Sequence, residues 1–286
     1  MTQPAFHLRM PERLMSGVVF ASPHSSSDYP ASFVRNSQLD ELTIRSSEDA
    51  FVDRLFDTAP DQGAPLLLAG VQRAFVDLNR SIDELDPALI DGARRNGHNP
   101  RVASGLGVIP RVVANGRAIY RGKISMTEAQ TRINHYWNPY HAELQRLLNN
   151  AHRQFGMAVL VDCHSMPHEA MDGAARHGRR APEIVLGDRF GAAAGAEIVE
   201  RIEAAFASAG LTVARNAPFA GAYVTQAYGR PSRNQHAVQI EIDRALYMDE
   251  RKIRPNSDFD KVRDLMRQVV REIAAINSNE LPLAAE

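Results

Sequence analysis

Short continuous apolar runs recur along the chain. The run at 158–161, Ala-Val-Leu-Val, is followed at once by the polar residues Asp, Cys, His and Ser. Such a run is typical of a strand covered on both faces, and in α/β sheets ligands bind at the carboxyl ends of such strands. The runs at 16–21 and 66–68 predict similar strands. Further strands are predicted at 74–78 and, from an alternating pattern, at 237–242.

Apolar residues at helical spacing predict amphipathic helices between these strands. The longest is predicted at 127–148, where Pro139 is expected to break or kink it. Two more are predicted at 192–209 and 258–276. A shorter helix is predicted to begin near Ser46, because serines that can cap a helix precede acidic residues there.

The alternation of strands and helices defines the expected architecture. It predicts a single α/β domain over residues 1–286, with a twisted mixed, largely parallel sheet flanked by helices. Stretches rich in glycine, arginine and other polar residues near 92–123 and 168–189 predict loop excursions from this sheet.

The composition narrows the class of function. A net charge of -1 argues against nucleic acid or an anionic membrane surface as a partner. No apolar run approaches the roughly 18 residues that span a bilayer, and the charged N-terminal stretch does not resemble a secretory signal. The single cysteine excludes an internal disulfide and fits a reducing compartment. We therefore expect a cytoplasmic enzyme or binding protein.

Two histidines follow predicted strands. His24 and His164 each lie just beyond an apolar run, so a common sheet edge could bring their imidazoles together. A catalytic zinc ion takes three protein ligands and leaves one position for water, so a carboxylate is the natural third ligand. Asp49 is the first choice, followed by Glu48 and then Asp53. The alternative is that both histidines are hydrogen-bonded residues at loop ends without a metal.

Alternation along the strands decides which side chains share a face. Glu241 lies in an otherwise apolar strand, where a buried carboxylate could act as a general acid–base beside a metal. The alternative is that Glu241 and Gln239 both lie on a solvated face of that strand. Cys163 and His164 are adjacent and point to opposite faces, so they cannot form a nucleophile–base pair. Cys163 is therefore predicted to be a small core residue.

Two arginines are candidates for binding an anionic group. Arg80, next to Asn79, and Arg230 could each hold a carboxylate with two hydrogen bonds, and Arg80 could also polarise a carbonyl. For Arg80 the alternative is a surface ion pair with a neighbour such as Asp83 or Glu84. Arg230 has the same two interpretations.

Taken together, these segments resemble the N-formylglutamate amidohydrolase family. The stretches that carry the resemblance are SPHSSSDYP at 22–30, EDAFVDRLF at 48–56, FVDLNR at 75–80, GLGVIPRV at 105–112, VDCHSMP at 161–167, GAYVTQAYGRP at 221–231 and QIEIDR at 239–244. They span about residues 16–250 in order. Ser26 stands where the family's histidine loop usually has glycine.

The resemblance implies a fold similar to zinc-dependent exopeptidases and one divalent metal ion, zinc in the first instance. The implied ligands are His24, a carboxylate near Asp49, and His164. Glu241 falls where those peptidases keep their general base, which takes a proton from the attacking water and passes it to the departing amine.

The resemblance also implies a substrate. Asn79 and Arg80 match the pair that grips a substrate carboxylate, Arg80 could stabilise the tetrahedral oxyanion, and Arg230 could hold a second carboxylate. The implied partner is a small-molecule N-acyl amino acid, with neither nucleic acid nor membrane. The implied reaction converts N-formylglutamate to glutamate and formate. The alternatives are a zinc amidase or carboxypeptidase-like hydrolase acting on another N-acyl amino acid or peptide, and a non-catalytic binding protein on the same scaffold.

Overall fold

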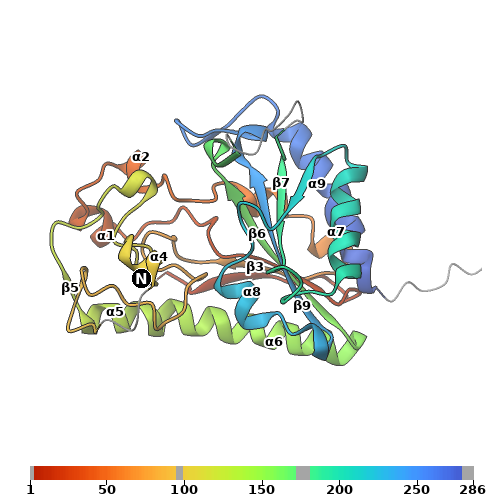
Figure 1. Cartoon of the computed structure of the whole chain (residues 1–286), viewed down its shortest axis with the longest axis horizontal. Coiled ribbons are helices and arrows are strands. Elements are labelled where there is room, and N and C mark those ends of the chain that lie inside the picture. Colours follow the sequence, from red (N-terminus) through yellow and green to blue (C-terminus); the bar gives the residue numbers. More distant parts are fainter. Residues whose placement is uncertain (1–2, 95–98, 172–180, 279–286) are drawn as a thin grey trace, which may run out of the picture.

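Seven strands form one mixed sheet in the computed structural model, which describes residues 3–94, 99–171 and 181–278 (Figure 1). In spatial order they are β1 (Phe6–Arg9), β3 (Leu66–Ala69), β2 (Val18–Ser22), β6 (Ala158–Met166), β9 (Gln235–Asp243), β7 (Ile184–Gly187) and β8 (Val213–Arg215). The four strands from β3 to β9 run parallel, whereas β1 and β7 are antiparallel to their neighbours β3 and β9. This confirms the predicted α/β fold with a mixed, largely parallel sheet.

Long helices cover both faces of this sheet. Helices α7 (Ala196–Ser208) and α9 (Phe259–Ala274) pack together on one face, and α6 (Asn138–Phe155) runs across the other (Figure 1). The short elements are α1 (Ala31–Asn36), α2 (Glu41–Ile44), α3 (Val52–Leu55), α4 (Pro100–Ala103), α5 (Met126–Arg132), α8 (Tyr223–Tyr228), β4 (Ile90–Asp91), β5 (Ile124–Ser125), β10 (Met248–Asp249) and β11 (Arg254–Pro255). Among the described residues, no helix is both long and apolar enough to cross a membrane.

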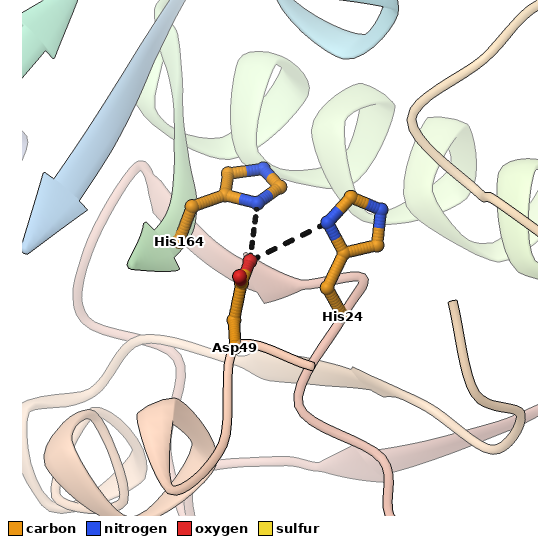
Figure 2. Close-up of side chains that lie close together, drawn as sticks. All are labelled: His24, Asp49 and His164. Atoms are coloured by element: carbon orange, nitrogen blue, oxygen red, sulfur yellow. Dashed lines mark hydrogen bonds and ion pairs between the residues drawn. The ribbon is translucent and has the colours of Figure 1, made fainter. Parts of the chain in front are cut away.

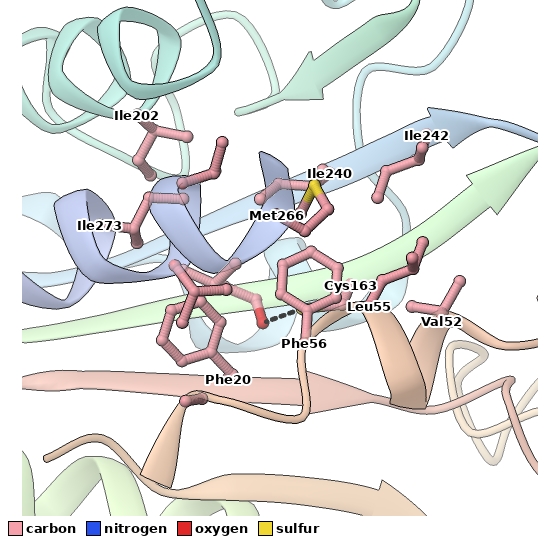
Figure 3. Packing of buried hydrophobic residues seen from close by; sticks show 14 of the residues in the cluster. Phe20, Val52, Leu55, Phe56, Cys163, Ile202, Ile240, Ile242, Met266 and Ile273 are labelled. Atoms are coloured by element: carbon pink, nitrogen blue, oxygen red, sulfur yellow. Dashed lines mark hydrogen bonds between the residues drawn. The ribbon is translucent and has the colours of Figure 1, made fainter. Parts of the chain in front are cut away.

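Alternation along β6 separates two apolar cores. Val161 and Cys163 face α7 and α9, where they pack in one cluster with Phe20 and Met266 (Figure 3). Leu160 faces the opposite side and packs in the cluster that contains the buried residues of α6. Cys163 is fully buried, which confirms the prediction that it is a core residue.

The same alternation selects the residues that reach the site. Beyond Leu160, the even-numbered positions Asp162 and His164 lie on the α6 side of the sheet. On the adjacent strand β9, Ile240 faces the α7–α9 core, so its neighbours Gln239 and Glu241 both face the α6 side. Four polar side chains are therefore gathered on one face, near the carboxyl ends of two paired strands.

The prediction of a strand at 74–78 is wrong. The chain there is an irregular series of turns that follows β3. Val76 and Leu78 are apolar because they are buried in the α6-side core, not because they pair with a neighbouring strand. Burial in an irregular segment produces the same short alternation as a half-buried strand.

Two other predicted elements differ in extent. The helix predicted to begin near Ser46 is reduced to the single turn α3, which leaves Asp49 in the preceding loop. The excursion predicted at 168–189 contains β7 as its last part, while 172–180 lies outside the described residues.

A π-helical turn, Ile133–Trp137, joins α5 to α6 without a break. Pro139 is the second residue after this turn. A proline at that position lacks the N–H for an intrahelical bond, and its ring crowds the carbonyl four residues earlier. The wider π turn accommodates both effects, so the predicted break is a local change of helical pitch.

We expect His141, on α6, to make the stability of the fold depend on pH. Its Nε2 donates to the carbonyl of Leu78 (2.9 Å), its Nδ1 accepts from the Tyr228 hydroxyl (2.8 Å), and burial lowers the pKa of His141 to about 4 from the ordinary 6.5. Between these pH values the unfolded chain binds a proton that the folded protein does not. The free energy of unfolding should therefore fall as the pH drops from 6.5 towards 4, by about 3 kcal/mol in full.

Urea unfolding at pH 7 and pH 5 measures this dependence. The variant His141→Gln should lose less stability between the two pH values than the wild type does. Equal losses in both proteins would contradict the assignment of this dependence to His141.

Candidate active site

Two histidines and an aspartate meet near the carboxyl ends of β2 and β6 (Figure 2). His24 lies in the loop after β2 and His164 lies within β6. Asp49 reaches them from the loop before α3, where its backbone N–H donates to the carbonyl of His24 (3.1 Å). Its Oδ2 lies 2.9 Å from Nδ1 of His164 and 3.4 Å from Nδ1 of His24. The donor atoms lie within 4.8 Å of one another and could hold a metal ion; we call these three residues the candidate metal group.

The far nitrogens of both imidazoles point at buried carboxylates. Nε2 of His24 donates to Oδ1 of Asp77 (2.8 Å), and Nε2 of His164 lies 3.0 Å from Oδ2 of Asp162. A proton on Nε2 serves such a carboxylate and turns the lone pair of Nδ1 towards Asp49, which is how a carboxylate orients a metal-ligating histidine. Nε2 of His164 also lies 3.1 Å from the amide nitrogen of Asn79. Nδ1 of His24 is buried and has no hydrogen-bond partner among the described residues. Two imidazoles and a carboxylate fit a catalytic zinc ion.

The electrostatics of this group favour a positive charge at its centre. Burial opposes protonation of His164, but the carboxylates of Asp162 and Asp49 raise its pKa well above the usual range. Burial likewise opposes ionisation of Asp49, but His164 and His24 hold its pKa well below the usual range. Oδ1 of Asp49 accepts from the guanidinium of Arg244 (2.9 Å), which fixes the carboxylate. The potential that draws a proton to His164 also draws a divalent cation in its place.

Glu241 lies directly beside His164. The two residues are register partners in the parallel pair β6–β9. Glu241 is only 8 % exposed, which excludes the alternative of a solvated face. Burial raises the pKa of Glu241 to about 7, and its Oε1 accepts from Nε2 of Gln239 (2.8 Å). A carboxyl group with this pKa both takes up and releases protons near neutral pH, as a general acid–base must.

A cleft of about 690 Å³ opens onto the candidate metal group. Its arginines are Arg73, Arg80, Arg101 and Arg244. The buried guanidinium of Arg80 donates to the carbonyl oxygens of Leu106 (3.1 Å) and Asn79 (3.0 Å). Burial lowers the pKa of Arg80, and the nearby charges of Arg73 and Arg101 act in the same direction. Arginines outnumber carboxylates in this lining, so the cleft suits an anionic ligand.

Asn79 lines the cleft with its side-chain amide already bonded to the protein. The amide nitrogen donates to Oδ2 of Asp162 (3.3 Å), and the amide oxygen accepts from the backbone N–H of Val224 (2.7 Å). Asn79 therefore connects α8 to the carboxylate that orients His164.

The structure does not bring Arg230 to the cleft. Its backbone pairs with Gln235, the first residue of β9, so Arg230 lies at the amino end of the strand whose carboxyl end carries Glu241. It lines a separate basic hollow together with Arg146 and Arg153 of α6. This position contradicts the prediction that Arg230 holds a second carboxylate at the site. Strand direction is the reason, because a residue just before β9 cannot reach its far end.

The two alternative acids lie outside the candidate metal group. Glu48 accepts from Nε of Arg45 (3.0 Å) and from its Nη2 (3.0 Å), so its carboxylate is occupied by an ion pair. Asp53 lies on α3 and is absent from the group, which contains Asp49 instead.

Several residues around the site were missed by reasoning from the sequence. They are Arg73, Asp77, Arg101, Gln239 and Arg244. Asp77 offered a signal, since it is a carboxylate between two apolar residues that prove to be buried. Asp162 lies two residues before His164 in the sequence, but only the structure shows that its carboxylate contacts the imidazole.

A mixed α/β sheet, a candidate metal group at the carboxyl ends of its strands and a buried glutamate beside that group are the arrangement expected of a hydrolytic enzyme. A family model described as N-formylglutamate amidohydrolase matches residues 16–248. The chain therefore belongs to the N-formylglutamate amidohydrolase family.

Relatives and a solved structure agree with this assignment. The chain is 32% identical over 242 residues to an N-formylglutamate deformylase of Pseudomonas aeruginosa, covering 82% of this chain and 83% of that protein. It is 31% identical over 224 residues to one of Pseudomonas putida, covering 76% of each. The crystal structure of an N-formylglutamate amidohydrolase from Ralstonia eutropha JMP134 superposes with a TM-score of 0.89 at 33% identity, covering 96% of this chain and 99% of that one.

Proposed function

We propose that this chain is a single α/β metallohydrolase domain that hydrolyses the amide of an N-formyl amino acid, with N-formylglutamate as the substrate and glutamate and formate as products. The observation that carries the proposal is the position of Glu241 as the register partner of His164, buried and with a pKa of about 7. The relatives named N-formylglutamate deformylase support the choice of substrate.

The candidate metal group would hold one divalent ion, which we propose to be Zn²⁺. His24, Asp49 and His164 are its ligands, and Asp77 and Asp162 orient the two imidazoles. When bound, such an ion polarises the substrate carbonyl and makes water acidic enough to lose a proton near neutral pH.

Glu241 carries the proton through the reaction. As the water oxygen bonds to the formyl carbon, Glu241 takes the proton that this water loses. As the carbon–nitrogen bond then breaks, Glu241 returns the proton to the departing amine nitrogen, which leaves formate and the free amino acid. Gln239 holds the carboxylate in place by its 2.8 Å bond to Oε1.

The arginines of the cleft bind the substrate carboxylates. Arg80 is buried and bonds carbonyl oxygens, so a carboxylate there would gain a charge-assisted bond and neutralise a buried cation. Arg101 and Arg73 line the same cleft and are the candidates for a second carboxylate, since Arg230 lies elsewhere; Nε of Arg73 also donates to Asp77 (3.1 Å). An excess of cations suits a substrate with two carboxylates, as N-formylglutamate has.

Metal analysis combined with a panel of N-formyl amino acids tests this proposal. The zinc-loaded protein should release formate from N-formylglutamate with a kcat/KM well above that for N-formylalanine or N-acetylglutamate. Preference for N-acetylglutamate or a peptide, with N-formylglutamate untouched, would contradict the substrate assignment.

One observation favours the second candidate, hydrolysis of another N-acyl amino acid or peptide. A hollow of about 500 Å³ adjoins the cleft and shares with it lining residues that include Ser46, Asn115 and Arg244. This space extends beyond what an N-formyl amino acid fills, so dipeptides belong in the same substrate panel.

We expect Arg80→Met to raise KM for N-formylglutamate by about 100-fold, because it removes a buried partner of a substrate carboxylate. Steady-state kinetics on the zinc-loaded protein measure this effect. The matched control is Arg230→Met, which makes the same chemical change in the separate hollow and should change KM less than about twofold. Equal effects of the two substitutions would contradict the assignment of Arg80.

A further inference from the structure

The segment that carries Asn79 and Arg80 has no regular structure of its own. It belongs to the irregular stretch between β3 and β4, so no sheet or helix fixes its backbone. Its carbonyl groups are held instead by two side chains from one helical face. The carbonyl of Leu78 accepts from Nε2 of His141 (2.9 Å), and the carbonyl of Arg80 accepts from Nε1 of Trp137 (2.9 Å). The backbone is therefore fixed by a hydrogen bond on each side of Asn79.

The π turn brings these two donors together. Trp137 is its last residue and His141 lies four positions further on, so both project from one face of the helix. Their rings lie against each other, with centroids 3.8 Å apart and planes tilted by 33°. Because each donor reaches a separate carbonyl of a short segment, the pair fixes the direction of that segment as well as its position.

Helix α8 holds the same segment from the other side. Since Nε2 of His141 donates to a carbonyl, Nδ1 must accept, and it does so from the hydroxyl of Tyr228 (2.8 Å). One turn of helix away from Tyr228, the N–H of Val224 donates to the side chain of Asn79 (2.7 Å). His141, Tyr228 and Asn79 are all buried, so each of these bonds is costly to break.

We propose that Trp137, His141 and Tyr228 are positioning residues that aim the Arg80 guanidinium at the substrate carboxylate. We call these three residues the aromatic clamp. The inference rests on the proposed function, since it takes Arg80 as the residue that binds a carboxylate. The clamp touches no reacting atom. It acts on binding, because it holds the backbone from which Arg80 reaches the cleft.

The chain contains a single tryptophan, so fluorescence excited where tryptophan alone absorbs reports on Trp137. The probe is glutarate, a dicarboxylate that resembles glutamate without the amine and cannot be hydrolysed. Glutarate should change the Trp137 emission of the zinc-loaded wild type, and Arg80→Met should abolish the change. Tyr228→Phe removes only the hydroxyl that fixes His141 and should weaken glutarate binding about 5-fold in the same titration.

Kinetics of Trp137→Phe separate positioning from stability. This variant keeps a ring but loses the donor to Arg80, and it should raise KM about 5- to 10-fold with kcat changed less than twofold. In the Arg80→Met background it should add almost nothing, because the clamp acts through Arg80. The control is Ser37→Ala, which also removes a buried donor to a carbonyl, that of Ile119 (3.0 Å), outside the cleft.

The outcomes distinguish this inference from the proposed function. If Trp137→Phe and Ser37→Ala alter KM equally, or if the losses of Trp137→Phe and Arg80→Met add, the clamp is only structural and the inference fails. If calorimetry shows that glutarate does not bind the zinc-loaded wild type, the proposed carboxylate site fails, and the inference fails with it.

Discussion

Replacing Glu241 by glutamine is expected to lower kcat by about 10³-fold or more while the protein keeps its metal. Glutamine preserves the size of the side chain and its contact with Gln239, but it cannot accept a proton from water. General acid–base groups contribute about 10²- to 10⁴-fold, and here one group serves both proton transfers. The measurements are kcat for N-formylglutamate and the zinc content of the same sample.

A matched control makes the same change elsewhere. Glu183 accepts hydrogen bonds from Thr212 outside the cleft, so Glu183→Gln should leave kcat within about twofold of the wild type. Unchanged turnover in Glu241→Gln would remove this residue as the base. Loss of zinc together with turnover would show instead that Glu241 supports the metal.

Replacing Asp49 by asparagine is expected to weaken zinc binding by at least about 100-fold. The substitution removes the negative charge from the candidate metal group and leaves the guanidinium of Arg244 without its carboxylate. Since a ligand present at about 1,000 times its Kd stabilises a protein by about 4 kcal/mol, excess zinc should raise the Tm of the wild type and have little effect on Tm in the variant. The comparison uses the zinc-induced change in Tm of each protein, and not the Tm itself, because Asp49→Asn is expected to be less stable than the wild type even without metal.

Two further variants make this test specific. Asp77→Asn leaves the three proposed ligands in place but alters a carboxylate that bonds the far nitrogen of His24, the guanidinium of Arg73 and the N–H of Asn79. It should weaken zinc binding about 10- to 100-fold. Asp188→Asn alters a buried carboxylate that bonds Asn216 away from the site, and should keep the full zinc-induced shift. An unaltered shift in Asp49→Asn would rule out Asp49 as a ligand.

The histidines could be predicted from the sequence because the signal is local. Each follows an apolar run, and parallel strands end at a common edge, so His24 and His164 were expected to meet. Asp49 was harder, because its approach depends on a loop bond to the carbonyl of His24 and not on a periodic pattern. The structure brings Asp49 to the histidines and leaves Glu48 with Arg45.

The other features of the site depend on pairing between segments that are far apart in the sequence. That Glu241 lies beside His164 follows from the register of β6 against β9, which no local pattern encodes. The prediction that Arg230 binds a carboxylate at the site was wrong because it considered only the residue type. The direction of β9 places Arg230 at the opposite end of the strand from Glu241. The prediction of a strand at 74–78 was wrong because buried turns and half-buried strands show the same short alternation of apolar and polar residues.

In the proposed mechanism, His164 and Glu241 act from two paired strands, whereas part of the cleft lining lies on loops. Adjacent strands lie about 4.8 Å apart, so the hydrogen-bonded ladder itself sets the spacing of these two residues. Part of the cleft lining, including Arg101 and Asn115, comes instead from the segment between β4 and β5. Exposed positions of that segment, such as Arg101 and Asn115, can therefore be varied in a search for activity on a different acyl amino acid. The paired strands should be kept unchanged, as should Leu106 and Val108, whose carbonyl groups bond Arg80 and Asp77.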